Sequence, residues 1–402
     1  MVQYLRESNK VFSTERKVIS FLEEKSAVLF VMISTVLALA VRWSGRDVLS
    51  PDYLICLDKW YQIILFNGLE ALRYGVGDYG VLYEFMVWIL TKIPVYPPYA
   101  FKAVSVIFDY SLAVGCGMLL CDLKDGKFSW KAFSIVYSAV LFFPPVFLNS
   151  AFWAQSDSIY VSFIVWALLL LRKKHFNWAF FFLGISLSFK LQMVFILPFI
   201  VYLYVRKKEF SILHFLWLPV TLFASTIPAL IVGRLWYAFI SIYTNQVNEY
   251  GSMSGNIPNF WCFMGGNYAN MSGPAVIMTM MILGLGLMLI IRYRTDLSDG
   301  RMFLILAAWS VLTAVEFLPN MHDRYFYLAD ILMLLLTVMD PRKFLKFFAV
   351  QAVSSIPLYT AVLFNNDTPH KMLAFLMIFS YVYFSYTVYD ECKSHRAEPG
   401  VS

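Results

Sequence analysis

A short polar segment near the C-terminal end of the chain carries side chains that can bind an anion. His322, Asp323 and Arg324 stand together in the sequence NMHDRYFY, between apolar runs at 302–318 and 327–339. An ordinary reversal between helices is built from Gly, Asn, Ser and Pro. Arg can donate two parallel hydrogen bonds to phosphate oxygens, and His can donate one more. We predict that Arg324 and His322 bind a phosphate group; an exposed turn with stray charges is the alternative.

The carboxylates that could act as a general base lie far from this segment, in the polar stretch after the first apolar run. Asp52, Asp58 and Asp78 all fall within residues 44–98. A positioned carboxylate that accepts a hydroxyl proton accelerates a reaction by roughly 10²- to 10⁴-fold. Asp52 is the first choice for this base and Asp58 the second, while Asp78 is expected to orient an acceptor or brace its loop. For a lone acidic residue, a solvated loop position is the alternative.

The composition indicates which elements must position these groups. The chain has 402 residues, 60% of them hydrophobic and only 14% charged, with a net charge of +6. A soluble protein of this size needs more polar surface, so we predict an all-α polytopic membrane protein. The basic residues stand in small groups beside apolar runs, as membrane anchors do, which argues against nucleic acid as a partner. The five cysteines include no CxxC pair, so neither a disulfide framework nor a zinc site is expected.

Apolar length predicts about twelve membrane-spanning helices, within a range of 11 to 13, since a crossing needs about 20 apolar residues. The expected spans are 26–43, 99–121, 131–149, 158–171, 177–189, 191–205, 211–232, 274–291, 302–318, 327–339, 344–364 and 372–389. Together they form one transmembrane domain at 26–389, with an N-terminal segment at 1–25 and a tail at 390–402.

The basic clusters orient this domain, because cytoplasmic loops collect Lys and Arg. The excess of Lys and Arg falls on the cytoplasmic side only if the apolar stretch 80–95 lies on the surface or re-enters instead of crossing. Both termini are then cytoplasmic, and the long loops 44–98 and 233–273 lie outside. The same rule folds 172–208 into a hairpin whose tip holds Lys190. A lysine in hydrocarbon costs about 2.5 to 3.5 kcal/mol, so we expect Lys190 to face a polar cavity; snorkelling to the lipid surface is the alternative.

Several segments on this outer side resemble those of a known enzyme group. They are SPDYLICLDKWYQIILFNG, DYGVLYEF, FWAQSDSIY, LSFKLQ and MHDRYFYLAD, which run in this order from about Ser50 to Asp330. Their order and spacing resemble bacterial membrane glycosyltransferases of the GT-C type, in particular mannosyltransferase-like proteins related to the second mannosyltransferase of GPI-anchor synthesis. The chain departs from that pattern at Ala154, where Gly is common, at Asp323, where Glu is common, and at Asp58-Lys59, which leaves the acceptor open.

The resemblance implies a transferase that takes its sugar from a polyprenyl phosphate. It implies a GT-C fold, an inverting transfer of a mannose- or glucose-type hexose, and a plasma-membrane location. The acceptor would be an extracytoplasmic glycan or a lipid-linked molecule, activated by the first acid of the SxDY stretch, here Asp52. Cations are needed where the leaving phosphate gathers charge, so Lys190 is expected to assist Arg324 and His322. Neither the sugar nor the acceptor can be named from the residues.

The segment Trp153-Ala154-Gln155-Ser156-Asp157 is the expected sugar contact. Asp157 and Gln155 can hold sugar hydroxyls and Trp153 can line the groove, although a turn-capping role is the alternative. The chain has no Gly-rich phosphate loop and no DxD triplet, which disfavours a soluble nucleotide-sugar donor. No cofactor is expected; a divalent cation shared by Asp52 and Asp78 is the open alternative.

Two other functions compete with this interpretation. A transporter or flippase of lipid-linked saccharides should have repeated halves and polar groups near the bilayer midplane. No repeat relates residues 1–200 to 201–402, and the polar residues gather at one end. A polymerase or ligase acting on lipid-linked oligosaccharides would depend on external Arg and His instead of an Asp base.

Overall fold

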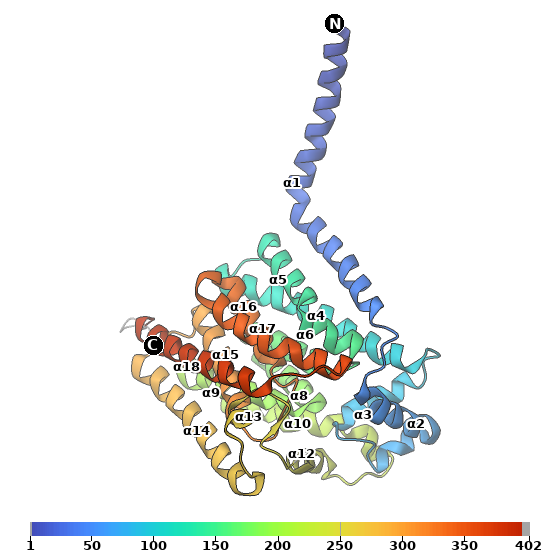
Figure 1. The fold of residues 1–402 in the computed structure, drawn as a ribbon, viewed down its shortest axis with the longest axis vertical. Helices are drawn as coiled ribbons and strands as arrows, with labels where there is room; N and C mark the ends of the chain where they lie inside the picture. Colours follow the sequence, from blue (N-terminus) through green and yellow to red (C-terminus); the bar gives the residue numbers. More distant parts are fainter. Residues whose placement is uncertain (1, 250, 396–402) are drawn as a thin grey trace.

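The long apolar runs of the sequence form helices, since a helix satisfies every backbone N–H and C=O group within one segment, as a membrane requires. The computed structural model describes residues 2–249 and 251–395 and is nearly all helical. Helix α1 (Val2–Ser44) projects from a bundle formed by the other helices (Figure 1).

The first half of the bundle contains the loop 44–98 and the hairpin around Lys190. Its elements are η1 (Tyr53–Leu57), α2 (Asp58–Asn67), η2 (Gly68–Arg73), α3 (Val81–Leu90), α4 (Pro97–Asp125), α5 (Trp130–Phe142), α6 (Pro144–Phe147), η3 (Leu148–Phe152), α7 (Asp157–Arg172), α8 (Phe176–Phe189), η4 (Leu191–Ile196) and α9 (Leu197–Lys207). Of these, η1 and η3 are π-helices, and η2 and η4 are 3₁₀-helices. A π-helical turn inside a helical run is frequently found at a functional site.

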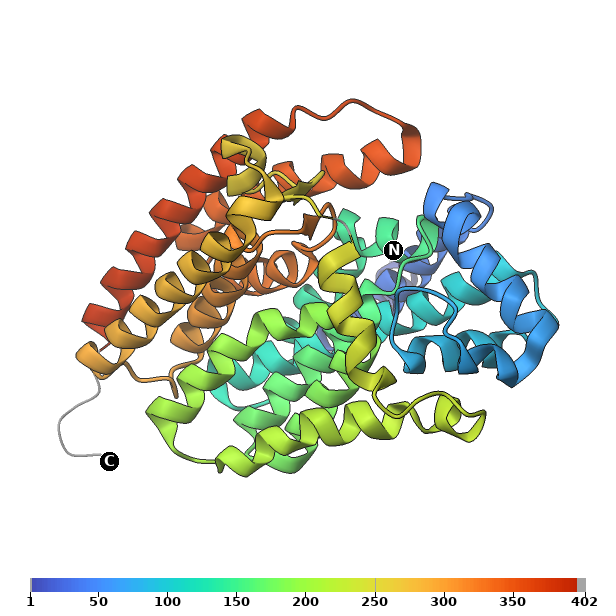
Figure 2. The same cartoon turned by 90° about the horizontal axis from the view of Figure 1, so that it is seen from below.

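The second half contains the loop 233–273 and the polar turn. Its elements are η5 (Ile212–Leu216), α10 (Trp217–Ser225), α11 (Ile227–Ile231), α12 (Ala238–Glu249), β1 (Ser254–Gly255), α13 (Phe260–Met264), α14 (Tyr268–Tyr293), α15 (Gly300–Phe317), β2 (Met321–His322), α16 (Tyr327–Met339), α17 (Pro341–Phe364) and α18 (His370–Ser394). Figure 2 shows helices α2 and α3 on one side of the molecule and the C-terminal helices on the other.

Six helices in the described part of the chain are long and apolar enough to cross a membrane, so this is a multi-pass membrane protein. They are α1, α4, α14, α15, α17 and α18; α5 with the segment Pro144–Phe152 makes a seventh crossing if this pair, bent by 55°, counts as one span. The other expected crossings fall on helices of 16 residues or fewer. The count of about twelve therefore stays a prediction. Helix α3 has ten residues, about 15 Å at 1.5 Å per residue, which is half a bilayer core.

The centre of the bundle is formed by α15 and α16, which are buried by their neighbours. In α15, 94% of the most apolar window is buried, and every residue from Tyr327 to Thr337 of α16 is buried. Helices α4, α7 and α8 pack side by side next to them. Neighbouring helices thus cover α7 and α16, so these short helices need not match the bilayer thickness themselves.

Buried carboxylates in these helices have polar partners. Asp109 pairs with Arg42 at 2.8 Å and accepts a hydrogen bond from Ser150, while Lys102 donates to backbone carbonyls such as that of Gly45 at 2.7 Å. In α16, Asp330 accepts hydrogen bonds from two side chains of α17. Lys102 and Asp109, which share a helical face in the sequence, thus have separate partners, and both have a structural environment.

Candidate functional site

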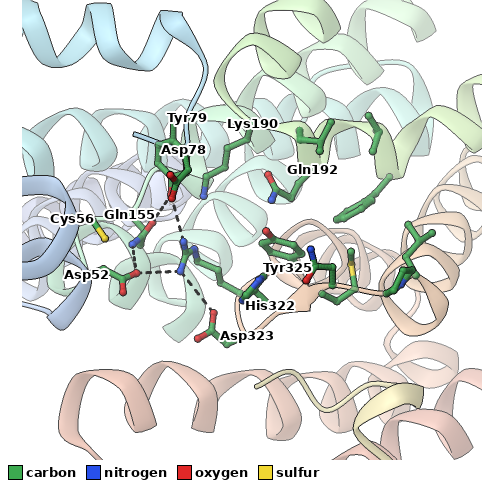
Figure 3. Close-up of a pocket in the computed structure, with 18 of the residues that line it drawn as sticks. Asp52, Cys56, Asp78, Tyr79, Gln155, Lys190, Gln192, His322, Asp323 and Tyr325 are labelled. Atoms are coloured by element: carbon green, nitrogen blue, oxygen red, sulfur yellow. Dashed lines mark hydrogen bonds and ion pairs between the residues drawn. The ribbon is translucent and has the colours of Figure 1, made fainter. Parts of the chain in front are cut away.

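A cavity of about 520 Å³ opens where the loop 44–98 meets the polar turn between α15 and α16. Its walls come from five separate stretches of chain: 52–60, 78–79, 190–195, 268–276 and 318–325, with Gln155 added from the segment before α7. Figure 3 shows Asp52, Asp78, Lys190, His322 and Asp323 around this space. A volume of this order is typical of a small-molecule site.

Asp52 is held by three donors that all reach the same oxygen. Its Oδ2 accepts hydrogen bonds from Trp153 Nε1 at 3.0 Å, Gln155 Nε2 at 2.7 Å and Arg324 Nη1 at 3.3 Å. The side chain is 37% exposed, far more than the other acids in contact with Arg324. Its carboxylate is therefore fixed in orientation and still reachable from the cavity.

The two side-chain donors next to Ala154 are positioned by local backbone structure. The Ser50 hydroxyl donates to the Trp153 carbonyl at 2.8 Å, and the Gln155 N–H donates to the carbonyl of Asn149 at 2.9 Å. Ala154 between them has a φ of 63°, in the left-handed region that favours glycine. This backbone conformation explains why a glycine suits this position in the pattern that the segment resembles.

Arg324 lies between three carboxylates and a tyrosine. Besides Asp52, its guanidinium lies 3.4 Å from Asp157 Oδ2 and 3.8 Å from Asp323 Oδ1, and Nη2 donates to the Tyr79 hydroxyl at 3.4 Å. The group also lies over the Trp153 ring, 5.3 Å from its centroid. Nη1 and Nη2 of the arginine predicted to bind phosphate thus donate hydrogen bonds to protein groups, while Nε is buried without a hydrogen-bond partner among the described residues.

Lys190 and Asp157 form a buried ion pair beside this arginine. Lys190 Nζ lies 2.6 Å from Asp157 Oδ1, and the two side chains are 3% and 1% exposed. Asn149 Nδ2 donates to the other oxygen of Asp157 at 2.7 Å. Lys190 has an extended backbone between α8 and η4, and its ammonium lies 5.2 Å from the Tyr79 ring centroid. The lysine therefore faces the polar cavity, as the sequence predicted, with Asp157 as its counterion.

Burial changes the proton affinity of the polar turn. It lowers the pKa of His322 to about 4, with the charge of Arg324 adding to the effect, so the imidazole is neutral at physiological pH. Burial also raises the pKa of Asp323 to about 6 and raises that of Asp78. His322 can therefore act at neutral pH as a hydrogen-bonding group and not as a cation.

Contacts with Arg234 and with the end of α8 fix the wall that carries Asp78 and Tyr79. Glu84 of α3 pairs with Arg234 at 2.7 Å and accepts a hydrogen bond from the Val76 N–H at 2.9 Å. A Cβ atom at Gly80 would lie 2.4 Å from the backbone oxygen of Ser188, so the chain passes closer there than any other residue allows. The wall is thus tied to the second loop and to the end of α8.

The polar turn is fixed by contacts with the loop 233–273. Strand β1 pairs in parallel with β2, with Gly255 opposite His322, and the Asn320 N–H donates to the Ser252 carbonyl at 3.1 Å. A Cβ atom at Gly255 would lie 2.5 Å from His322 Nδ1. This short pairing sets where the imidazole enters the cavity.

Most of the residues singled out in the sequence meet at this site. The cavity is lined by Asp52, Asp78, Gln155, Lys190, His322 and Arg324. Trp153 and Asp157 lie directly behind it, in contact with Asp52 and Arg324. Asp58 does not line it and accepts a hydrogen bond from Gln62 at 3.4 Å instead. Gln155 and Trp153 direct their N–H groups at Asp52, a role that the sequence did not suggest.

Sequence reasoning missed Tyr79 and Gln192, which also line the cavity. The Tyr79 hydroxyl donates to Gln155 Oε1 at 3.1 Å and so links the first loop to the segment that holds Asp52. Its only sequence signal was its place between Asp78 and Gly80, in a chain where 18% of residues are aromatic. Asp323 was noted as part of the polar turn and as a departure from a pattern but was given no role, although it lies 3.8 Å from Arg324.

The described residues include no group of three or more His, Cys, Asp or Glu side chains placed to hold a metal ion. No protein-family model and no curated protein sequence matches the chain.

Proposed function

We propose that this chain is a membrane glycosyltransferase of the GT-C type that moves a hexose from a polyprenyl phosphate to an acceptor outside the cytoplasm. The observation that carries the proposal is the meeting of a reachable carboxylate and a cation in one cavity: Asp52 Oδ2 lies 3.3 Å from Arg324 Nη1, although 272 positions separate the two residues. Transfer from a phosphate carrier needs both groups, one for the incoming hydroxyl and one for the leaving phosphate.

The proposed reaction is a single displacement with inversion. Asp52 takes the proton from the acceptor hydroxyl while that oxygen bonds to the anomeric carbon of the sugar. The bond between this carbon and the phosphate oxygen breaks, and polyprenyl phosphate leaves with the bonding electrons. Arg324 and Lys190 stabilise the negative charge that collects on the phosphate, and neutral His322 donates a hydrogen bond to it.

Binding of the sugar donor would change the contacts that Arg324 makes with the protein. The cavity and its rear wall hold Asp52, Asp157 and Asp323 against Arg324 and Lys190, so an entering phosphate must compete for the guanidinium. When the phosphate takes Arg324, Asp52 loses one of the three donors on Oδ2 and gains a free lone pair for the acceptor proton. Trp153 and Gln155 keep the carboxylate in place during this exchange.

The surrounding fold is proposed to follow the orientation given by the basic clusters. About twelve helices cross the plasma membrane, both termini are cytoplasmic, and the cavity opens on the outer side. A prenyl chain then remains in the bilayer while its phosphate and sugar reach the cavity. The proposed acceptor is a cell-surface glycan or a lipid-linked molecule.

The test is the mass of the lipid that copurifies with the full chain, followed by a transfer assay with that lipid as donor. A polyprenyl-phosphate hexose that is consumed and leaves polyprenyl phosphate supports the proposal. A copurified oligosaccharide on a lipid diphosphate that is extended by whole repeat units would support the polymerase alternative. Movement of an intact lipid-linked sugar between leaflets, without cleavage, would make the protein a transporter.

A further inference from the structure

A second cavity lies between α14, α15 and α18, and none of its lining residues lines the first cavity. Its volume is about 290 Å³, and its floor includes Trp309, Val388 and Cys392, which are at most 5% exposed. Leu285 and Val382 at its mouth are 59% and 60% exposed. Figure 2 shows α14 running alongside α18 at the edge of the molecule. The cavity is therefore a groove on the face of a membrane helix pair.

The walls of this groove present apolar surface only. Trp309 Nε1 donates to the Ser385 hydroxyl at 2.9 Å, and the Tyr381 hydroxyl is hydrogen-bonded to Thr313 at 2.9 Å, so these polar groups are satisfied within the protein. Gly286 lets α14 approach, because a Cβ atom there would lie 2.4 Å from the Trp309 ring. Only an occupant with a hydrocarbon chain gains from such a surface.

One end of the groove is polar and positively charged. Leu289 lines the groove, and three positions further on Arg292 is exposed at the end of α14. Lys393, one helical turn after Tyr389, is exposed at the end of α18. The hydroxyls of Tyr293 and Tyr389 lie 3.3 Å apart between the two helices. The nearby Glu391 is buried and occupied by Arg301 at 2.8 Å and by Lys343, so it does not cancel these cations. A phosphate at this end would find two cations and two hydroxyls.

We propose that this groove binds an anionic phospholipid, with an acyl chain between α14 and α18 and the phosphate at Arg292 and Lys393. The apolar floor and the basic, hydroxyl-bearing end match the two parts of that one molecule, and basic residues at a membrane surface attract anionic lipids. The site is separate from the proposed transferase cavity: the residues that line the two cavities do not overlap. It would operate whatever reaction the other cavity performs.

The test is a competition between lipids for the purified full chain. Protein in detergent is incubated with equal amounts of phosphatidylglycerol and phosphatidylcholine that carry the same acyl chains, then washed, and the retained lipids are measured by mass spectrometry. We expect phosphatidylglycerol to be retained about tenfold over phosphatidylcholine, and the double variant Arg292→Gln/Lys393→Gln to bring this ratio near one. The matched control is Lys124→Gln/Lys127→Gln, which removes the same charge from exposed positions at the end of α4 and in the loop after it, and keeps the ratio.

Equal retention of the two lipids by the wild-type chain would overturn the proposal, as would an equal loss in the control. A second measurement needs no variant: phosphatidylglycerol with a photoreactive acyl chain is crosslinked to the wild-type chain and the site is mapped. Crosslinks to groove residues such as Leu285 and Val382 support the site. Crosslinks spread evenly over α1, α17 and the other exposed helices show ordinary contact with bulk lipid and overturn it.

Discussion

At the scale of single residues, the site consists of carboxylates grouped around the guanidinium of Arg324, with Lys190 beside it. Arg324 contacts Asp52, Asp157 and Asp323, and Lys190 is neutralised by Asp157. Sequence reasoning chose Asp52 and Arg324 as partners in one reaction, and their contact is as close as that choice requires. It did not foresee that the carboxylates would outnumber the cations, because pairing depends on distances that the order of residues does not contain.

The first prediction concerns the geometry of Arg324. In Arg324→Lys the single ammonium cannot reach Asp52, Tyr79 and Asp157 together, so the phosphate and the base both lose support. We expect kcat/KM for transfer to fall by about 10²-fold, the usual effect of losing one charge-stabilising donor. Arg46→Lys, at an exposed arginine paired with Asp47 at 3.0 Å, serves as control and should keep full activity. An active Arg324→Lys enzyme would remove the guanidinium from the mechanism.

The second prediction uses the opposite pKa shifts in the polar turn. His322 has a folded pKa of about 4 against an ordinary 6.5, so the unfolded chain binds more protons in that window and stability rises with pH. Asp323 has a folded pKa of about 6 against an ordinary 3.8, so the folded chain binds more protons and stability falls as pH rises through that range. The two effects oppose each other between about pH 4 and 6.

Removing one of these two groups should expose the other. Thermal unfolding midpoints measured at pH 7 and pH 4.5 should fall further for Asp323→Asn than for the wild type on acidification. For His322→Gln, the midpoint should fall less on acidification than it does for the wild type. Curves for the three proteins that run parallel across this pH range would contradict the assignment of burial as the cause.

At the scale of elements, the sequence predicted the apolar helices better than the pieces that carry the site. Periodicity and length anticipated α4, α14, α15, α17 and α18, and the tip of the hairpin at Lys190. They gave no sign of the π-helices η1 and η3 or of the pairing between β1 and β2. Those pieces arise from contacts between distant segments, such as Ser50 with Trp153, which no local pattern encodes.

The third prediction concerns the close packing of the wall that holds Asp78 and Tyr79. In Gly80→Ala the new Cβ atom would lie 2.4 Å from the backbone oxygen of Ser188 and 2.9 Å from the Tyr243 hydroxyl, so the wall must move. A displacement of about 1 Å at a site can cost about 10²-fold in rate, and we expect kcat for transfer to fall by that order. The measurement is the transfer rate at saturating donor.

The matched control is Gly284→Ala in α14, where the added Cβ meets no atom within 4 Å. Alanine is also favoured over glycine inside a helix by about 0.8–1.0 kcal/mol, so this variant should keep its rate and its stability. If Gly80→Ala transfers sugar at the control rate, the wall does not set the position of the reacting groups.

At the scale of the whole molecule, the proposed function requires the acidic and basic side chains of the site to lie at the same end of the membrane protein. The lipid-facing helices have the length that composition predicted, but several expected crossings are short helices buried among others. Composition cannot distinguish a helix covered by lipid from one covered by protein, because both are apolar. The expected number of crossings therefore follows from apolar length, and the side on which the cavity opens follows from the positive-inside rule alone.

The fourth prediction tests that orientation. Cysteine placed at Asn67, exposed at the end of α2, should react with an impermeant maleimide in intact cells. Cysteine placed at Lys127, exposed in the loop after α4, should react only after the cells are permeabilised. Labelling is compared with the wild type to subtract the five native cysteines. The reverse pattern would place the cavity on the cytoplasmic side.

The central claim is that the carboxylate beside Arg324 accepts the proton of the sugar acceptor, and one pair of variants tests it most directly. Asp52→Asn keeps the size of the side chain and its donors Trp153 and Gln155 nearby, while Asp58→Asn removes the same charge six positions along the chain, away from the cavity. Sugar transfer and donor binding are measured for both. We predict that Asp52→Asn binds donor but transfers sugar roughly 10²- to 10⁴-fold more slowly, with Asp58→Asn like the wild type. Wild-type transfer by Asp52→Asn would contradict the account.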